Sequence, residues 1–318
     1  MGTMVGMLVL AVAMGTAQAD VAAQGLLSAG RVDVAIADLL VHLRSEPKDA
    51  EAHYLLCRAY YGLQHWDDAI SSCQKAIALQ PDNSTYHMWL GRAFGEKAER
   101  SSWFSALSLA RKVHSEFERA VELDHNNLQA QADLAEYYVD APSFLGGGKD
   151  KARAQATRIA SVNPATAHWV QAQIAEKDSN WTAAENEYRA AIKASGNDAT
   201  YWLSLASFYR RRNRLNDMEA AINDASKAQT TKNDVWVDAA ELLYRAGRNF
   251  PEAVQFLQHY LSSNATTEDA PAFQVHYLLG SIFEKQGQKQ AAADQYRAAL
   301  SLARNFSPAQ QALDRLNR

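Results

Sequence analysis

The chain has 318 residues, of which 47% are hydrophobic and 21% are charged. This composition is close to that of folded globular chains and excludes disordered, fibrous and disulfide-dense proteins. The 32 basic and 36 acidic side chains give a net charge of −4, which offers no general attraction to nucleic acid or to an anionic membrane. We therefore expect no nucleic-acid partner.

The first 19 residues have the outline of a signal peptide. Residues 4–14 are apolar and uncharged, and the small residues Ala17 and Ala19 precede the first acidic residue, Asp20. An apolar stretch of about 11 residues is too short to span a bilayer, and the small residues fit the cleavage rule. We predict cleavage after Ala19, export, and no membrane insertion afterwards. The segment before the apolar run has no Lys or Arg, so a truncated start or an ordinary first helix is the alternative.

A repeat of 34 residues organises the rest of the chain. Apolar residues recur at three- and four-residue spacing over residues 54–60 and 69–77, which predicts two helices per unit, called here helix A and helix B. The period is visible in matching residues along the chain: Pro47 and Pro81; Leu56 and Leu90; His168, Trp202 and Trp236; Ala172, Ala206 and Ala240. So many matches at one offset predict a tandem array.

The clearest copy of the repeat runs over residues 50–81. Its bulky, aromatic, small and proline positions are occupied in turn by Leu56, Tyr60, Ala69, Ala76 and Pro81. This pattern and the period of 34 resemble the tetratricopeptide repeat family. The resemblance implies an all-α fold, a right-handed superhelical α-solenoid of antiparallel helix pairs, in which short side chains let helix A approach helix B.

The repeat phases predict the organisation of the whole chain. A partial N-terminal repeat spans residues 20–49, an array of about seven repeats spans 50–306, and a capping helix spans 307–318. Two units depart from the period, through a helical insertion near residues 95–112 and an irregular Gly-rich loop at 141–149. The Gly-rich loop, together with residues 91–97 and 117–121, resembles a group of exported bacterial tetratricopeptide proteins. A periplasmic or secreted bacterial location is therefore expected.

The resemblance also implies a non-catalytic scaffold that binds a protein or peptide. In this family the helix A residues that do not pack on helix B line a concave groove, where aromatic and Arg residues anchor partners. That phase predicts the following partner-binding residues: Tyr54, Arg58, Tyr61, Met88, Trp89, Arg92, Trp169, Gln173, Leu203, Arg210, Tyr244 and Tyr277. The alternative for each aromatic residue is packing between neighbouring units.

We expect no catalytic residue, no cofactor and no metal site. Gly146-Gly147-Gly148-Lys149 lacks the strand, the glycine spacing and the following Ser or Thr of a nucleotide-binding loop. The chain has no HExxH or CxxC motif, and no pair of His at four-residue spacing. Four histidines occupy one repeat position, where a packing role is expected: His53, His87, His168 and His276. An enzyme or regulatory subunit using the Gly-rich loop is the less favoured alternative.

Three further features leave alternatives open. Cys57 and Cys73 face inward from the two helices of one unit, and they form either a disulfide or two buried thiols. The basic run over residues 210–214 lies where a helix A ends, and it is either a solvated helix end or a contact for an anionic ligand. Trp103 and Phe104 in the insertion favour a self-associating assembly module as the rival to a scaffold.

Overall fold

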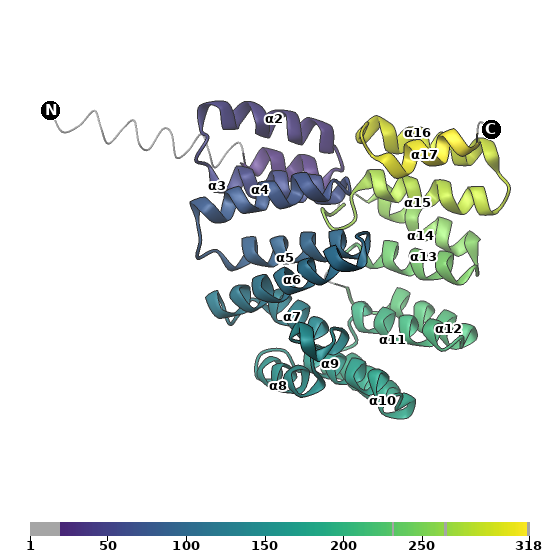
Figure 1. Ribbon diagram of the computed structural model, residues 1–318. Coiled ribbons are helices and arrows are strands. Elements are labelled where there is room, and N and C mark those ends of the chain that lie inside the picture. The colour runs from purple at the N-terminus through teal and green to yellow at the C-terminus, as the bar shows by residue number, and fades with distance from the viewer. Residues whose placement is uncertain (1–19, 231, 264–265, 317–318) are drawn as a thin grey trace. The chain divides into compact units, whose positions relative to one another are not determined.

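Residues with helical periodicity form pairs of antiparallel α-helices in the computed structural model (Figure 1). The structure describes residues 20–230, 232–263 and 266–316. Within these ranges there is no β-strand, and the only β-type pairing is an isolated bridge between Asp198 and Gln229. The predicted all-α fold of helix pairs is thus confirmed. The predicted signal peptide, residues 1–19, lies outside the described residues.

One compact unit contains residues up to Asp82 together with residues from Thr266 onward. A helical segment at residues 20–28 begins it. Its remaining helices come from both ends of the chain: α2 (Val32–Ser45), α3 (Ala50–Gly62), α4 (Trp66–Leu79), α15 (Ala272–Lys285), α16 (Lys289–Leu302) and α17 (Ser307–Leu316). The last helix pair and the first ones therefore belong to the same unit.

Contacts inside this unit join residues more than 200 positions apart. The Gln274 side-chain amide donates to the Gly62 carbonyl at 2.8 Å, and the backbone N–H of Arg304 donates to Asp33 Oδ2 at 2.9 Å. The terminal repeats of the chain therefore pack on the first ones inside this unit. The last helix, α17, contacts α16, and its role as a capping helix stays a prediction.

The second unit spans Asn83–Ala265 and contains five further helix pairs. In chain order its helices are α5 (Ser84–Glu99), α6 (Trp103–Leu123), α7 (Leu128–Asp140), the 3₁₀ turn η1 (Ser143–Leu145), α8 (Lys149–Ala160), α9 (Pro164–Lys177), α10 (Trp181–Ala194), α11 (Ala199–Arg211), α12 (Leu215–Lys227), α13 (Val235–Ala246) and α14 (Phe250–Ser262). The odd-numbered helices are the A helices of this unit, and the even-numbered ones are its B helices.

Short polar side chains fix where many helices begin. The first backbone N–H groups of a helix lack partners within the helix, and an Asp or Asn side chain before it supplies an acceptor. Six residues accept such a bond at the start of α3, α5, α7, α9, α10 and α11: Asp49, Asn83, Asn127, Asn163, Asn180 and Asp198. The residue before each of these six helices therefore helps to determine where the helix begins.

Small residues allow the two helices of a pair to approach closely, as the sequence predicted. A Cβ atom at Gly91 of α5 would lie 2.5 Å from the Phe117 ring of α6, and one at Gly280 of α15 would lie 2.5 Å from the Tyr296 ring of α16. Both distances are far inside van der Waals contact. Glycine at these positions lets an aromatic ring of helix B lie directly on the backbone of helix A.

The two irregular regions take defined forms. The insertion lengthens both helices of its pair, so that α5 has 16 residues and α6 has 21. The Gly-rich loop contains η1 and ends at Lys149, where α8 starts. No helix among the described residues combines the length and the apolar character needed to span a bilayer.

A disulfide links the two helices of one pair. Cys57 of α3 is bonded to Cys73 of α4, with their Cα atoms 5.2 Å apart. Both residues are fully buried. Of the two states that the sequence left open for these cysteines, the structure contains the disulfide.

Candidate binding surface

The A helices of the second unit form a continuous row. Each one contacts the next, from α5 to α7, α9, α11 and α13. Two hollows open along this row, and we call the surface that contains them the A-helix surface. The larger hollow has a volume of about 410 Å³ and the smaller one about 290 Å³.

The larger hollow lies between α7, α9 and the C-terminal end of α11. Charged side chains dominate its lining: Glu136, Asp140, Glu176, Lys177, Arg211 and Arg212. Most of them already have partners, since Arg211 Nη2 donates to Glu176 Oε1 at 2.6 Å and Lys177 Nζ donates to Asp140 Oδ1 at 3.3 Å. The Arg212 guanidinium lies over the Trp181 ring, with its Cζ atom 3.8 Å from the ring centroid. The charges of this hollow are therefore largely balanced from within.

Glu136 is the carboxylate of this hollow whose pKa is shifted. Surrounding protein atoms displace water from it, and Asp133 and Asp140 repel its charge, so its pKa rises to about 7. Its surface nevertheless stays exposed at the mouth of the hollow, so water screens part of this effect. A cation arriving here would favour the ionised form of Glu136 and lower its pKa.

The smaller hollow lies between α11 and α13. Its lining combines hydroxyl side chains with two arginines and two carboxylates: Thr200, Ser204, Ser207, Arg210, Arg245, Asp238 and Glu241, with Leu203 and Leu242. Arg245 is held by Glu241, with 2.5 Å between Nη2 and Oε1. This pair leaves Arg210 as the second guanidinium of the hollow.

Arg210 is a cation without a hydrogen-bond or ion-pair partner among the described residues. Its Nε atom is buried and donates to no acceptor. Burial lowers the pKa of its guanidinium, and the neighbouring charges of Arg245 and Arg211 lower it further, against a weaker opposite effect of Glu241. A buried donor without an acceptor costs about 1–3 kcal/mol, more for a charged group. An anionic group placed in the hollow would supply the missing acceptor.

Three of the predicted partner-binding residues line these hollows. Gln173 lines the larger one, whereas Leu203 and Arg210 line the smaller one. Trp169 on α9 and Tyr244 on α13 are half-buried on the same row of helices. Gln173, Arg210, Trp169 and Tyr244 keep their place as candidates, whereas Leu203 is only 6% exposed and offers little surface to a partner.

Three other predicted partner-binding residues are buried. Met88 is 1% exposed, Trp89 is 7% exposed and Tyr54 is 8% exposed. A side chain that solvent does not reach cannot anchor a partner without repacking. These exposures favour the packing alternative for all three residues.

Arg58 and Arg92 are tied to carboxylates. Each guanidinium does stack on the aromatic residue expected beside it, Tyr54 and Trp89 respectively. Arg58 Nη1, however, lies 2.8 Å from Glu268 Oε2. Arg92 donates to both oxygens of Asp133, at 2.6 and 3.2 Å. These two arginines connect segments of their own unit and are not free to pair with a ligand.

The last two predicted aromatic residues are in packing contacts. Tyr61 meets the Trp66 ring edge-on, with 5.2 Å between centroids. Tyr277 contacts Phe306 and Tyr296, at 5.5 and 5.7 Å. Both tyrosines follow the packing alternative that the sequence left open.

The residues that sequence reasoning missed lie at the ends of the A helices. Asp140, Lys177 and Arg211 are at or next to the last residue of α7, α9 and α11, and all three line the larger hollow. The basic run over residues 210–214 was the available signal. Its helix-end position had favoured a solvated role, yet three of its arginines line the two hollows.

The Gly-rich loop uses its amides internally. The N–H groups of Gly146, Gly147 and Gly148 donate to the carbonyls of Ser143, Pro142 and Tyr138. Amides that already donate within the chain are not available to cradle a phosphate.

The shared histidine position connects helix A to helix B in three repeats. His87 pairs with Glu116 at 2.6 Å, His168 with Glu187 at 2.7 Å and His276 with Gln295 at 2.8 Å. The fourth residue, His53, contacts the Pro47 carbonyl at 3.2 Å. These contacts agree with a packing role.

Comparisons with protein families find the same repeat in several parts of the chain. Profiles described as tetratricopeptide repeat match residues 50–83 and 273–306, and a third such profile matches 146–199 and 170–234. None of the curated proteins compared with the chain matches it.

Solved structures show a similar fold. A thermophilic TPR protein of Thermus thermophilus is 18% identical, with a TM-score of 0.50 over 61% of this chain and 98% of that one. A tetratricopeptide repeat protein of Parabacteroides merdae is 16% identical, with a TM-score of 0.41 over 85% and 99% of the two chains.

Proposed function

The chain belongs to the tetratricopeptide repeat family, and from this premise we propose that it is a non-catalytic scaffold that binds a segment of another protein on its A-helix surface. The observation that carries the proposal is Arg210, a partly buried cation without a hydrogen-bond or ion-pair partner among the described residues, at the smaller hollow. A carboxylate of the bound segment would accept from this guanidinium, and charge-assisted bonds of this kind are among the stronger ones.

The arrangement of the surface supports a polypeptide ligand. The two hollows lie along one row of helices, so an extended segment could fill both. Leu203 and Leu242 add apolar contact in the smaller hollow, while Ser204 and Thr200 offer hydroxyl groups. Because this surface is already formed, binding costs it little conformational entropy, and most of the entropy lost is that of the ligand.

Export to the periplasm or beyond is part of the same proposal. The disulfide between Cys57 and Cys73 supports it, because disulfides persist in oxidising compartments and are rare in the cytosol. The signal-peptide outline of residues 1–19 supports it independently of the structure.

Self-association is the second candidate function, and one observation favours it. Trp103 and Phe104 at the start of α6 are 69% and 84% exposed, and adjacent exposed aromatics are common at interaction sites. Mass measured by light scattering over a concentration series distinguishes the two functions. If Trp103→Ser with Phe104→Ser abolished a concentration-dependent increase in mass, and Phe144→Ser on the loop did not, self-association through α6 would be favoured.

Affinity capture with matched charge reversals tests the scaffold. Arg210→Glu reverses the charge in the smaller hollow, and Arg158→Glu makes the same change on the exposed side of the B helix α8. We expect partners captured by the wild-type chain to be retained by Arg158→Glu and reduced at least about tenfold by Arg210→Glu, a loss of about 1.4 kcal/mol. Equal retention by both variants would contradict binding at this surface.

A further inference from the structure

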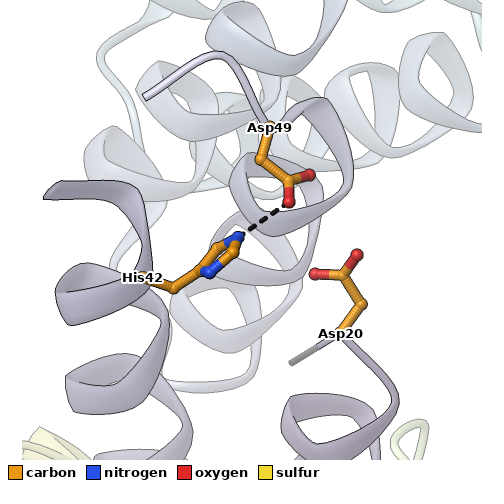
Figure 2. Close-up of side chains that lie close together, drawn as sticks. All are labelled: Asp20, His42 and Asp49. Carbon is orange, nitrogen blue, oxygen red and sulfur yellow. Dashed lines mark hydrogen bonds and ion pairs between the residues drawn. The ribbon is translucent and has the colours of Figure 1, made fainter. Parts of the chain in front are cut away.

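Three side chains that could bind a metal ion converge at the start of the first unit. Asp20 begins the helical segment 20–28, His42 lies in the last turn of α2, and Asp49 caps the start of α3. One nitrogen or oxygen atom from each residue lies within 4.8 Å of the others. Figure 2 shows the imidazole of His42 beside the carboxylate of Asp49, with the carboxylate of Asp20 directed into the same space.

Two of these side chains are held in place by bonds that leave their metal-binding atoms facing inward. Asp49 Oδ1 accepts from the Ala52 amide at 3.1 Å, so that its Oδ2 atom is directed at His42 Nε2, 2.8 Å away. The side chains of His42 and Asp49 are only 14% and 10% exposed. A preorganised pair of this kind needs little rearrangement to coordinate an ion.

The third side chain has an unsatisfied atom. Asp20 Oδ1 is buried and accepts no hydrogen bond from the described residues. The two carboxylates of Asp20 and Asp49 share one imidazole, and this excess of negative charge is costly in a partly buried place.

Helix capping alone does not explain this combination. One repeat period later, the positions of His42 and Asp49 are held by Ala76 and Asn83. Asn83 caps α5 with an uncharged amide. The Asp49 carboxylate is an ordinary helix cap, as Asp198 is for α11, whereas the imidazole of His42 beside it is not needed to cap a helix.

We propose that Asp20, His42 and Asp49 form a binding site for a divalent transition-metal ion such as Zn²⁺. Zn²⁺ binds imidazole nitrogen and carboxylate oxygen at about 2.0–2.2 Å, which places the ligand atoms of a tetrahedral site about 3.4 Å apart. The three side chains reach this spacing through small movements, and water completes the coordination. A nitrogen ligand disfavours Ca²⁺ and Mg²⁺, which prefer oxygen.

The ion would join three elements that follow one another in the chain. The helical segment 20–28, α2 and α3 each contribute one ligand, so binding would fix the first helix on the rest of the unit. Because a preformed site of this kind is absent from the unfolded chain, binding would also raise the stability of the folded state. The role is structural and independent of Arg210 and the A-helix surface.

Calorimetric titration of the untagged full chain, stripped with a chelator, tests the site with Zn²⁺ as the probe. We expect one ion per chain, a higher melting temperature on binding, and binding at least about tenfold weaker in His42→Ala and in the isosteric Asp20→Asn. His125→Ala removes an exposed histidine elsewhere and should bind as the wild type does. Far-UV circular dichroism verifies that each variant keeps its helices.

Three results would overturn the proposal. The first is a wild-type chain with no saturable binding of one Zn²⁺ ion. The second is unchanged binding in helical Asp20→Asn and His42→Ala chains. The third is Ca²⁺ binding as tightly as Zn²⁺, which would refute the assignment to a transition metal.

Discussion

Two glycines one turn apart in α5 have opposite surroundings. A Cβ atom at Gly91 would lie 2.5 Å from the ring of Phe117, whereas at Gly95 its nearest neighbour would be Val113 Cγ2 at 3.9 Å. Alanine stabilises a helix interior by about 0.5–1 kcal/mol relative to glycine where space allows. The two positions therefore separate helix propensity from packing.

We predict that Gly95→Ala raises the free energy of unfolding by about 0.5–1 kcal/mol. Gly91→Ala should lower it by about 1–3 kcal/mol, because the Phe117 ring would have to move within a packed pair. Urea unfolding of both variants measures the difference. Equal effects of the two substitutions would mean that α5 and α6 do not approach as closely as the structure has them.

Asp20 makes the metal-free protein sensitive to pH. In the folded state its pKa is raised from 3.8 to about 6. The folded state therefore gains stability from the protonated Asp20, fully at a pH below the pKa of the unfolded chain, and loses this stability as the pH rises through about 6. Asp20→Asn cannot ionise. We predict that this variant melts at a higher temperature than the wild type near neutral pH, and that the difference shrinks toward about pH 4.

The measurement is a pair of melting curves across this pH range with a chelator present. Glu51, Asp49 and His42 remain in both chains, so their own titration largely cancels in the difference. If the variant were the less stable chain at neutral pH, the ionised Asp20 would be stabilising, and its carboxylate would not be strained by burial.

At the scale of elements, the disulfide closes a short loop between α3 and α4. The two cysteines are 16 residues apart, and a loop of this length corresponds to about 3 kcal/mol of stabilisation in the chain-entropy description. We predict that Cys57→Ala with Cys73→Ala lowers the free energy of unfolding by about 2–4 kcal/mol. A reductant should lower the melting temperature of the wild type and have no effect on the double variant.

The period of 34 residues predicted the helix pairs well, because it depends on local spacing and small residues. The close contact at Gly91 and the lengthening of α5 and α6 by the insertion follow from the same pattern. Partner-facing residues were predicted less well. Whether Met88 or Trp89 faces solvent depends on which other helices pack on α5. The position of a residue around a single helix does not predict those neighbours.

Contacts between residues far apart in the sequence could not be predicted from the repeat pattern either. Arg58 pairs with Glu268 across 210 positions, and no pattern within either repeat indicates this. Asp20, His42 and Asp49 come from three successive segments, and their spacing matches no familiar metal-binding motif. The Arg210 run could be seen in the sequence, but its lack of a partner required the positions of Glu241 and Arg245.

In the whole molecule, the row of A helices in the second unit is the surface that we propose a partner binds. The two hollows are not equivalent on this surface. The larger one has its charges paired within the chain, whereas the smaller one contains Arg210. The smaller hollow is therefore where a bound segment would make its most specific contact.

Site-specific photo-cross-linking tests this claim most directly. A photoreactive residue at Ser204 lies in the smaller hollow, and one at Thr157 lies on the exposed side of the B helix α8. We predict adducts of defined mass from position 204, their loss when Arg210→Glu is added, and none of the same adducts from position 157. Identical adducts from both positions, or adducts at 204 that persist with Arg210→Glu, would contradict it.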